Sequence, residues 1–451
     1  MKLRKVAVVV LTATVLAINA APVSALVPPQ VLIGPTPPDD PPGPEFPTKQ
    51  NEGCLSAGVL RDSDLSRTPP AELALDLPRA RSLSRGAGVT VAVIDTGVSP
   101  HPRLPNLIGG GDYIAAGGDG LSDCDAHGTL IAGIIGARPD AADGFTGVAP
   151  DARIISIRNY SGAFGPDRVS IEPDALMATK IRTLARAIVH AANLGAGVIT
   201  VSLPICVKVD KQPNQSELAA AIGYAVRIRG SLIVAGAGGG SSGDCGSNPD
   251  MDWTRPEDVR NWKYVHTIST PGWFAPEVLT VGYTTATGAP MNDSMSGPWV
   301  SVGAPGTGIE SLGPAGDGLI NGIGEPNKLV PVGGSSFAAA YVSGVAALLR
   351  SRFPNETPGE ISARLQASAH RPARGIDNVI GAGIIDPMVA LGYRTPPKPP
   401  AGLFTSRPLL IPDPPRAKDK RPAVAATIVI FAAVLLGVGA TYASSVIRRR
   451  R

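Results

Sequence analysis

The chain has 451 residues, of which 43% are hydrophobic, 17% are charged and 4% are aromatic. This composition excludes an intrinsically disordered chain and is typical of a compact, glycine-rich α/β core. The formal net charge is only +4, and much of it comes from Arg448 to Arg451 at the end of the chain. The charge pattern therefore predicts no nucleic-acid partner.

The N-terminus has the three parts of a secretory signal peptide. Three basic residues in the first five positions precede the apolar stretch VAVVVLTATVLAIN, and small residues lead up to Val23-Ser24-Ala25. This pattern predicts a signal peptide over residues 1–25 that is cleaved after Ala25. The alternative is an N-terminal anchor that the mature protein retains.

Residues 26–86 are predicted to form an extension ahead of the catalytic domain. Its first part, residues 26–50 (LVPPQVLIGPTPPDDPPGPEFPTKQ), is rich in proline. Because proline lacks a backbone N–H donor, this part cannot form a helix or a central strand. It is either a loose spacer or an extended arm that lies on the folded domain.

Residues 87–394 alternate short β-branched runs with alanine-rich stretches of helical pattern. Near-continuous apolar runs are typical of strands covered on both faces, as in parallel sheets. Strands are expected over Val89–Ile94, Arg153–Ile157, Gly197–Val201, Ser231–Ala235 and Val278–Val281, and helices over Ala175–Leu194 and Glu217–Arg229. This order predicts an α/β fold, a doubly wound parallel sheet with helices on both faces and ligands at the carboxyl ends of the strands.

Asp95 ends the first of these strands, in the segment VAVIDTGVSPHP. An acid at the carboxyl edge of a parallel sheet can be buried there and can hold an imidazole ring. The alternative for a single aspartate at a strand end is that Asp95 only caps the next turn.

His127 stands in DCDAHGTLIAGIIG, ahead of apolar residues at helical spacing. It is therefore expected to open a buried helix. Histidine is the side chain best suited to move a proton near neutral pH. The alternative is a core histidine whose ring is bonded only to the backbone.

Ser336 is expected to begin another helix, in GGSSFAAAYVSGVAALL. A hydroxyl at a helix N-terminus lies near unpaired N–H groups and the positive end of the helix dipole, which favours a developing oxyanion. Alternatively Ser336 is only an N-cap, and Ser335 competes for both roles. Small residues later in the helix permit close packing at the centre of the fold: Ala338, Ala339, Ala340, Ser343 and Gly344.

The C-terminal part of the chain predicts a membrane anchor. Residues 395–422 are again proline-rich and predict a semi-rigid stalk. Residues 423–447 carry no charge and are long enough to span a bilayer as a helix. The arginines at 448–451 place this end in the cytoplasm as a short basic tail. We expect a single-pass type I protein of the cell membrane whose catalytic domain is extracytoplasmic.

The four cysteines, Cys54, Cys124, Cys206 and Cys245, favour disulfides over metal ligands in an exported chain. No CxxC pair is present and the five histidines are scattered, so no metal site is expected. Spacing alone leaves all three disulfide pairings open. The acids Asp119, Asp123 and Asp125 are interpreted as the solvated face of a loop rather than as calcium ligands.

Together, DTGVSPHP, HGTLIAG and GGSSFAAAYVSG resemble the three signature motifs of the subtilase family of serine proteases, in the chain order Asp, His, Ser. The resemblance extends over roughly residues 87–391. It implies that Asp95 orients the imidazole, that His127 is the general base and that Ser336 is the nucleophile. It also implies that the backbone of Ser202, Leu203 and Pro204 binds substrate.

In more detail the chain resembles the mycosins, the subtilisin-like proteases associated with type VII secretion. The signal peptide, proline-rich extension, DCDAHG and SFAAAYVSG segments, stalk and terminal membrane helix carry this resemblance. Ala340 stands where most subtilases have proline, and mycosins share that alanine. The resemblance implies an extension that wraps the domain and does not act as a cleaved inhibitor. It also implies the disulfides Cys54–Cys124 and Cys206–Cys245.

Gly239 departs from the subtilase pattern. Subtilases end the segment after the fourth expected strand in Ala-Gly-Asn, and the asparagine amide donates a hydrogen bond to the oxyanion. Here the sequence is Ala237-Gly238-Gly239, so residue 239 supplies no side-chain donor, and the N–H of Ser336 with nearby donors is expected to hold the oxyanion. Loss of that amide in subtilisin costs roughly 100- to 1000-fold in kcat, whereas loss of the serine or histidine costs on the order of a million-fold. The candidates for a substitute donor are Ser241, Ser242 and Asn248.

These observations predict a slow serine endopeptidase that cuts peptide bonds of secreted or secretion-related proteins through an acyl-enzyme, with no metal or organic cofactor. Its expected partners are protein or peptide substrates, the type VII secretion membrane complex and the lipid bilayer around residues 423–447. The alternative is a catalytically weakened protease-fold subunit that mainly stabilises the secretion complex. An esterase with the same triad has only shared chemistry in its favour.

Overall fold

The computed structural model describes residues 29–31, 34–167, 171–239, 245–316, 318–398, 400, 403 and 421–448. The chain divides into two compact units, residues 1–404 and residues 405–451. The predicted signal peptide (1–25), most of the stalk and the last three arginines lie outside the described residues.

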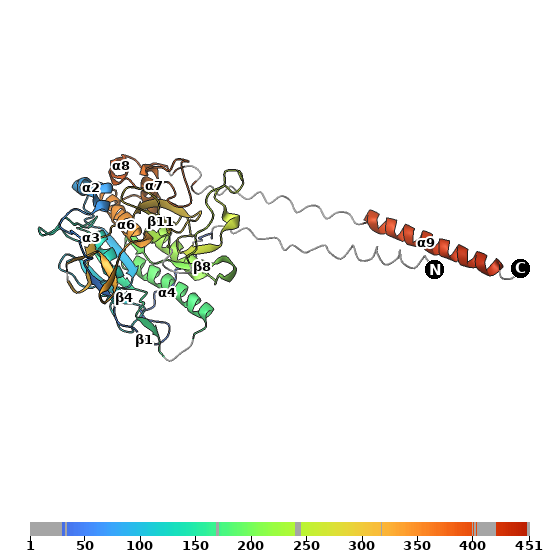
Figure 1. The fold of residues 1–451 in the computed structure, drawn as a ribbon, viewed down its shortest axis with the longest axis horizontal. Coiled ribbons are helices and arrows are strands. Elements are labelled where there is room, and N and C mark those ends of the chain that lie inside the picture. Colours follow the sequence, from blue (N-terminus) through green and yellow to red (C-terminus); the bar gives the residue numbers. More distant parts are fainter. Residues whose placement is uncertain are drawn as a thin grey trace. The chain divides into compact units, whose positions relative to one another are not determined.

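A seven-stranded sheet forms the centre of the first unit (Figure 1). Its strand order is β12-β11-β9-β7-β3-β5-β4, and all its pairings are parallel. The strands are β3 (Thr90–Asp95), β4 (Leu107–Asp112), β5 (Arg153–Arg158), β7 (Val198–Val201), β9 (Leu232–Gly236), β11 (Val278–Thr284) and β12 (Val300–Pro305). Because β3 has β5 on one side and β7 on the other, its carboxyl end lies at the switch point of the sheet, where ligands bind in such folds.

The five strands expected from the sequence are all in this sheet, within a few residues of their expected ends. The sequence does not predict β4 and β12. β4 has the sequence LIGGGD, without a β-branched run. Gly110 is nonetheless needed there, since a Cβ at this position would lie 2.4 Å from Cγ2 of Ile155 on β5. Its glycines thus permit the close approach of β4 to β5.

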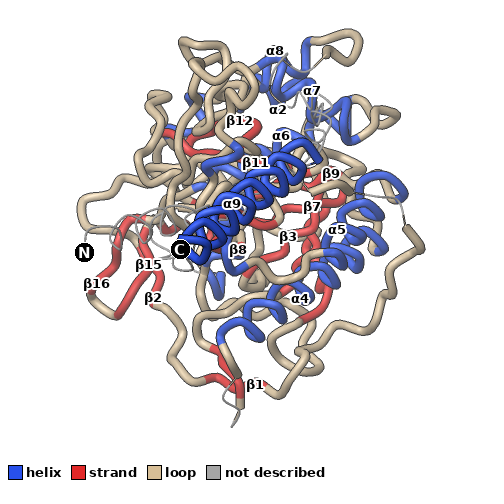
Figure 2. Tube along the Cα trace, turned by 90° about the vertical axis from the view of Figure 1, so that its right-hand side faces the viewer, coloured by secondary structure: helices blue, strands red, loops and turns tan. Residues whose placement is uncertain are grey.

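Helices cover both faces of the sheet, as Figure 2 shows for α6 on one side and α4 and α5 on the other. Alternate residues of β3 divide between two cores. Val91 and Val93 pack in the core that contains α3 and α6, whereas Ala92 and Ile94 pack in the core that contains α4 and α5. The helices are α3 (His127–Gly136), α4 (Pro173–Asn193), α5 (Ser216–Gly223) and α6 (Ser335–Arg352). The helix expected over 217–229 is α5 followed by a π-helical turn, Tyr224–Ile228.

The N-terminal extension lies on the first unit as an arm rather than as a loose spacer. Asp39 accepts hydrogen bonds at 2.9 Å from both His190 and Asn193 of α4. Glu45 pairs with Arg182 of the same helix at 2.6 Å. Two short strands of the extension pair with strands of the domain: β1 (Thr48–Gln50) pairs with β6 (Phe164–Pro166), and β2 (Ser56–Gly58) pairs with β15 (Gly322–Glu325). The proline-rich stretch is thereby tied to the fold, chiefly through its acids.

The remaining elements surround the sheet. The strands are β1 (Thr48–Gln50), β2 (Ser56–Gly58), β6 (Phe164–Pro166), β8 (Ile205–Lys208), β10 (Thr267–Thr270), β13 (Ser311–Leu312), β14 (Leu319–Ile320), β15 (Gly322–Glu325) and β16 (Lys328–Pro331). The helices are α1 (Pro70–Ala74), α2 (Leu77–Leu83), α7 (Pro358–Ser368) and α8 (Pro387–Gly392).

The second unit contains α9 (Arg421–Arg448). Its stretch Val429–Arg448 has 20 residues, a mean hydropathy of 1.9 and no burial. This length and composition are sufficient to cross a membrane.

Close packing of α6 depends on its small residues. Every residue of this helix from Ser335 to Leu349 is buried. A Cβ at Gly344 would lie 2.5 Å from Cβ of Val148, which is closer than two carbons can approach. A larger residue at position 344 would therefore displace the helix whose first turn carries Ser336.

We expect Gly344→Ala to lower the free energy of unfolding by about 1–3 kcal/mol, since overpacking outweighs the better helix propensity of alanine. Gly359→Ala in α7 is the matched control, because a Cβ there meets no atom within 4 Å. Urea unfolding of both variants measures the difference. Equal stability of the two variants would show that the α6 contact is not close-packed.

Candidate active site

Asp95, His127 and Ser336 meet at the carboxyl edge of the sheet, at the end of β3 and in the first turns of α3 and α6. Nδ1 of His127 lies 2.8 and 3.0 Å from the two carboxylate oxygens of Asp95. Nε2 of the same ring lies 2.9 Å from Oγ of Ser336. Asp95 is fully buried and the His127 side chain is only 14% exposed. The three side chains thus form one continuous, largely buried chain of hydrogen bonds.

Ser335 has a different partner from Ser336. Its Oγ accepts a hydrogen bond at 2.9 Å from the N–H of Gly238, in the turn that follows β9. The structure therefore brings Ser336, and not Ser335, to the imidazole. Asp95 also accepts from the N–H of Thr96 at 2.6 Å, so it caps the next turn in addition to holding the ring.

The charges of Asp95 and His127 support each other. Burial raises the pKa of Asp95, but the imidazole of His127 and hydrogen bonds from His127, Ser202 and Thr96 outweigh burial and hold that pKa below its usual range. Burial lowers the pKa of His127, but the charge and hydrogen bond of Asp95 outweigh it and raise the pKa above 6.5. The pair therefore favours an ionised carboxylate beside a basic imidazole.

Ser202, Leu203 and Pro204, expected to bind substrate, connect β7 to β8 and so lie at the same edge of the sheet. The hydroxyl of Ser202 donates to Oδ2 of Asp95, and Ser202 is fully buried. The sequence does not predict this bond. It gives Ser202 a role in holding the Asp95 carboxylate, which its position directly after an apolar strand could have suggested.

Both expected disulfides are present. Cys54 is bonded to Cys124, three residues before His127, and this fastens the extension beside the triad. Cys206 is bonded to Cys245. This second disulfide packs against the turn after β9, since a Cβ at Gly238 would lie 3.2 Å from Sγ of Cys245. Each disulfide thus braces a segment next to the site.

The loop acids do not form a solvated face, contrary to the sequence interpretation. Asp119 is exposed, but Asp125 is buried and Asp123 is half-buried. Asp125 accepts hydrogen bonds from Ser161 and Gly162. Asp123 accepts hydrogen bonds from the hydroxyls of Thr96 and Thr129. A carboxylate can be buried where such donors satisfy it, and these two carboxylates therefore lie inside the fold rather than on a solvated face. Within the described residues, no group of three or more His, Cys, Asp or Glu side chains is placed to hold a metal ion.

Asn248 is not placed as a substitute oxyanion donor. Its Nδ2 donates to the carbonyl oxygens of Thr267 and Ser296, at 2.9 and 2.8 Å. Its Oδ1 accepts from the N–H groups of His266 and Thr267. The amide is therefore fully occupied in fastening backbone segments together. The other two candidates, Ser241 and Ser242, lie outside the described residues.

Gly239 lies in the turn after β9, bridged to Ser294. Its backbone is compatible with an L side chain, but a Cβ would lie 3.1 Å from the carbonyl oxygen of Asp293. An asparagine at this position therefore requires a shift of a few tenths of an ångström. The N–H of Ser336, in the first turn of α6, is free of an intrahelical acceptor by its position and can serve an oxyanion.

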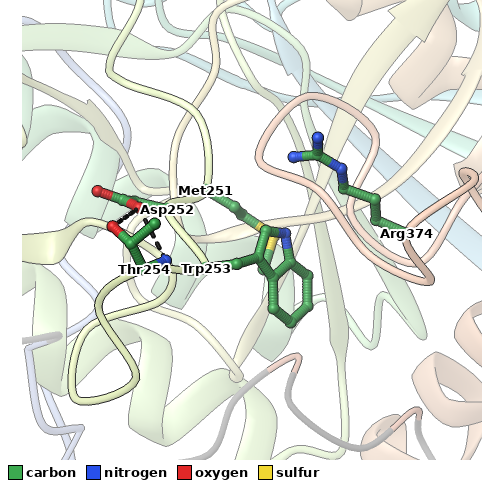
Figure 3. A pocket seen from close by; sticks show the side chains of 5 residues that line it. All are labelled: Met251, Asp252, Trp253, Thr254 and Arg374. Carbon is green, nitrogen blue, oxygen red and sulfur yellow. Dashed lines mark hydrogen bonds between the residues drawn. The ribbon is translucent and has the colours of Figure 1, made fainter.

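A depression elsewhere in the first unit is lined by Met251, Asp252, Trp253, Thr254 and Arg374 (Figure 3). Asp252 accepts from both the N–H and the hydroxyl of Thr254. Arg374 comes from a separate loop. None of these residues belongs to the hydrogen-bonded chain of Asp95, His127 and Ser336, and we assign the depression no chemistry.

The model of the subtilase family matches residues 86–383 of the chain. The chain belongs to the subtilase family. It is 44% identical over 457 residues to Mycosin-1 of Mycolicibacterium smegmatis, which covers 100% of both chains. It is 45% identical to Mycosin-3 of Mycobacterium tuberculosis over 95% of this chain and 94% of that relative. The motif-based prediction of a mycosin among the subtilases is thereby confirmed.

Solved structures agree with this assignment. The crystal structure of MycP1 from Mycobacterium smegmatis is similar with a TM-score of 0.79 and 45% identity, and covers 85% of this chain and 99% of that one. A chain in the structure of an intact ESX-5 inner membrane complex is similar with a TM-score of 0.80 and 45% identity, over 93% of this chain and 100% of that one. The predicted fold class is confirmed by these likenesses and by the parallel sheet.

Titration of His127 by NMR tests the electrostatics of the pair. In the wild type we expect a pKa above 6.5. In Asp95→Asn we expect a pKa below 6.5, because burial then outweighs the weaker charges of Asp123 and Asp125. An unchanged pKa in this variant would show that Asp95 does not set the basicity of the ring.

Proposed function

We propose that this mycosin is a slow serine endopeptidase whose catalytic triad is Asp95, His127 and Ser336. The observation that carries the proposal is the His127 ring, bonded on one side to a buried carboxylate and on the other to the hydroxyl of Ser336. This is the arrangement of acid, base and nucleophile that serves acyl transfer.

The reaction follows from the direction of these hydrogen bonds. Oγ of Ser336 attacks the carbonyl carbon of the peptide bond, and its proton passes to Nε2 of His127. Asp95 stabilises the resulting imidazolium through Nδ1. Nε2 then gives the proton to the leaving amine, and water hydrolyses the acyl-enzyme by the same route. Because the base must be neutral, kcat/KM falls as pH drops below the raised pKa of His127.

The oxyanion hole explains why the proposed protease is slow. The N–H of Ser336 and nearby backbone donors hold the oxyanion, and the backbone of Ser202, Leu203 and Pro204 binds substrate as an added strand. Gly239 has no side-chain amide to donate, so kcat is expected to be lower by roughly 100- to 1000-fold than in a subtilase with asparagine at this position. Because the nucleophile and the base are intact, we expect a slow enzyme rather than an inactive one.

The proposed organisation follows the sequence. We expect a single-pass type I protein of the cell membrane. In chain order it consists of a signal peptide (1–25), an extension (26–86), a catalytic domain (87–394), a stalk (395–422), a membrane helix (423–447) and a cytoplasmic tail (448–451). α9 supports the anchor, and the arginines after it support a cytoplasmic C-terminus. Because a similar chain occurs in an ESX-5 inner membrane complex, we assign this mycosin to a type VII secretion membrane complex and its substrates to secreted or secretion-related proteins.

A second candidate function is a structural subunit whose protease fold mainly stabilises the secretion complex. Gly239 favours it, since a subunit that mainly stabilises a complex does not need a strong oxyanion hole. Complementation separates the two: if Ser336→Ala restores secretion fully while deletion of the domain does not, catalysis is dispensable.

Labelling of the full-length protein in detergent with a fluorophosphonate probe tests the proposed activity. We expect slow labelling of the wild type and none of Ser336→Ala, because the probe reacts with an activated serine. Ser335→Ala is the control, since it removes the neighbouring hydroxyl and keeps the nucleophile. Labelling of Ser336→Ala but not of Ser335→Ala would show that Ser335, and not Ser336, is the nucleophile.

Gly239→Asn tests the oxyanion hole. We expect kcat to rise towards the 100- to 1000-fold that this donor contributes in subtilisin, less the cost of moving the Asp293 carbonyl. Gly239→Ala adds the same Cβ without an amide, so it controls for that cost and should not raise kcat. Peptide hydrolysis measures both. A gain in Gly239→Ala equal to that in Gly239→Asn would mean that the amide is irrelevant.

A further inference from the structure

The turn that leads into His127 has a feature that the triad alone does not explain. Ala126, directly before His127, has φ of +61°, a left-handed conformation that alanine rarely adopts. Ala126 is the N-cap position of α3, and it supplies no side-chain cap. Other groups must therefore hold the start of this helix.

Asp123 and Thr96 supply the missing cap. Oδ2 of Asp123 accepts from the N–H and the hydroxyl of Thr129, at 2.9 and 2.7 Å. Oγ1 of Thr96 accepts from the N–H of Gly128 at 2.8 Å. Two N–H groups of the first turn of α3 are thus satisfied from outside the helix. Thr96 in turn donates from Oγ1 to Oδ1 of Asp123 at 2.8 Å.

Thr96 connects this cap to the triad. It follows Asp95 in the chain, and its N–H donates to Oδ1 of Asp95, the oxygen that lies 2.8 Å from Nδ1 of His127. The Asp123 carboxylate is therefore bound on one side to the residue after Asp95 and on the other to the helix that begins with His127.

We propose that Asp123 is a positioning residue, whose carboxylate clamps the end of β3 to the start of α3 and so sets the His127 ring against Asp95. The proposal rests on the proposed function, because the pair that it positions is the acid and base of that reaction. Asp123 does not touch the reacting atoms and acts through Thr96 and α3.

A carboxylate is required because four donors converge on Asp123. Oδ1 also accepts from the N–H of Asp125 at 3.1 Å, so each oxygen accepts two hydrogen bonds. An asparagine has one acceptor oxygen and would turn an NH₂ group towards the other two donors. Burial raises the pKa of Asp123 to about 6, so the carboxylate is mostly ionised at neutral pH. Asp123→Asn is nearly isosteric and removes half of the clamp.

Asp125 provides a matched control. It belongs to the same turn and is buried, but its carboxylate binds Ser161 and Gly162, in the segment after β5, rather than β3 or α3. Asp125→Asn makes the same chemical change two residues away. A general weakening of the turn affects both variants, whereas a positioning role affects only Asp123→Asn.

The test compares these variants in the full-length protein in detergent. Peptide hydrolysis gives kcat and KM, and NMR follows the low-field resonance of the His127 Nδ1 proton. That resonance is identified by its absence in His127→Ala. For Asp123→Asn we expect kcat to fall by about 10- to 100-fold with KM unchanged, as for a displacement of up to about 1 Å. We also expect the resonance to shift or disappear. Asp125→Asn should keep both kcat and resonance close to those of the wild type.

A second pair of variants covers the case in which Asp123→Asn does not fold. Thr96→Val removes the hydroxyl that joins Asp123 to β3, and Thr96→Ser restores it. We expect the loss of kcat and the change in resonance in Thr96→Val and their rescue in Thr96→Ser. Equal behaviour of the two Thr96 variants would overturn the proposal.

The proposal is also overturned if Asp123→Asn keeps the wild-type kcat and resonance while its melting temperature falls. Asp123 would then only stabilise the turn. If the wild type itself shows no turnover, the proposed function fails, and the resonance alone decides on Asp123, because the Asp95–His127 hydrogen bond does not need turnover to be observed.

Discussion

The structure of this mycosin depends on keeping one carboxylate ionised inside the protein. Asp95 is fully buried at the end of β3, where an unpaired charge would cost several kcal/mol. The imidazole of His127, the hydroxyl of Ser202 and the N–H of Thr96 offset that cost. Each of these donors comes from a different segment that reaches the carboxyl edge of the sheet. The same bonds that stabilise the charge also raise the basicity of His127.

Close packing is the second requirement, because α3 and α6 must bring His127 and Ser336 together across this edge. Small residues make it possible: α6 is buried along most of its length, and Gly344 lies against Val148. The two disulfides and the N-terminal arm add constraints from outside. The triad is therefore closely packed, whereas position 239, in the turn after β9, carries no side-chain amide.

Much of this could be predicted from the sequence, because the decisive signals are local. Asp95 directly follows an apolar strand, and His127 and Ser336 each open an apolar helix, so the fold class and the three side chains follow from short motifs. The expected pairing of Cys54 with Cys124 and of Cys206 with Cys245 came from family resemblance rather than from spacing.

What the sequence could not predict depends on contacts between loops that meet only in the fold. The glycine-rich β4 has no strand pattern and is recognisable only from its contact with β5. Asn248 looked like a free amide, yet its four hydrogen bonds go to backbone segments around Thr267 and Ser296. Asp123 looked solvated because neighbouring acids usually are, and its partners Thr96 and Thr129 lie on separate elements.

In the proposed mechanism an intact triad works beside an oxyanion hole without a side-chain amide. A structure of the protein after reaction with a fluorophosphonate would show the nucleophile and the oxyanion donors together. We expect phosphorus bonded to Oγ of Ser336, with the phosphoryl oxygen accepting from the Ser336 N–H and from no side chain of residue 239. Phosphorus on another residue, or a phosphoryl oxygen turned away from the Ser336 N–H, would contradict this mechanism.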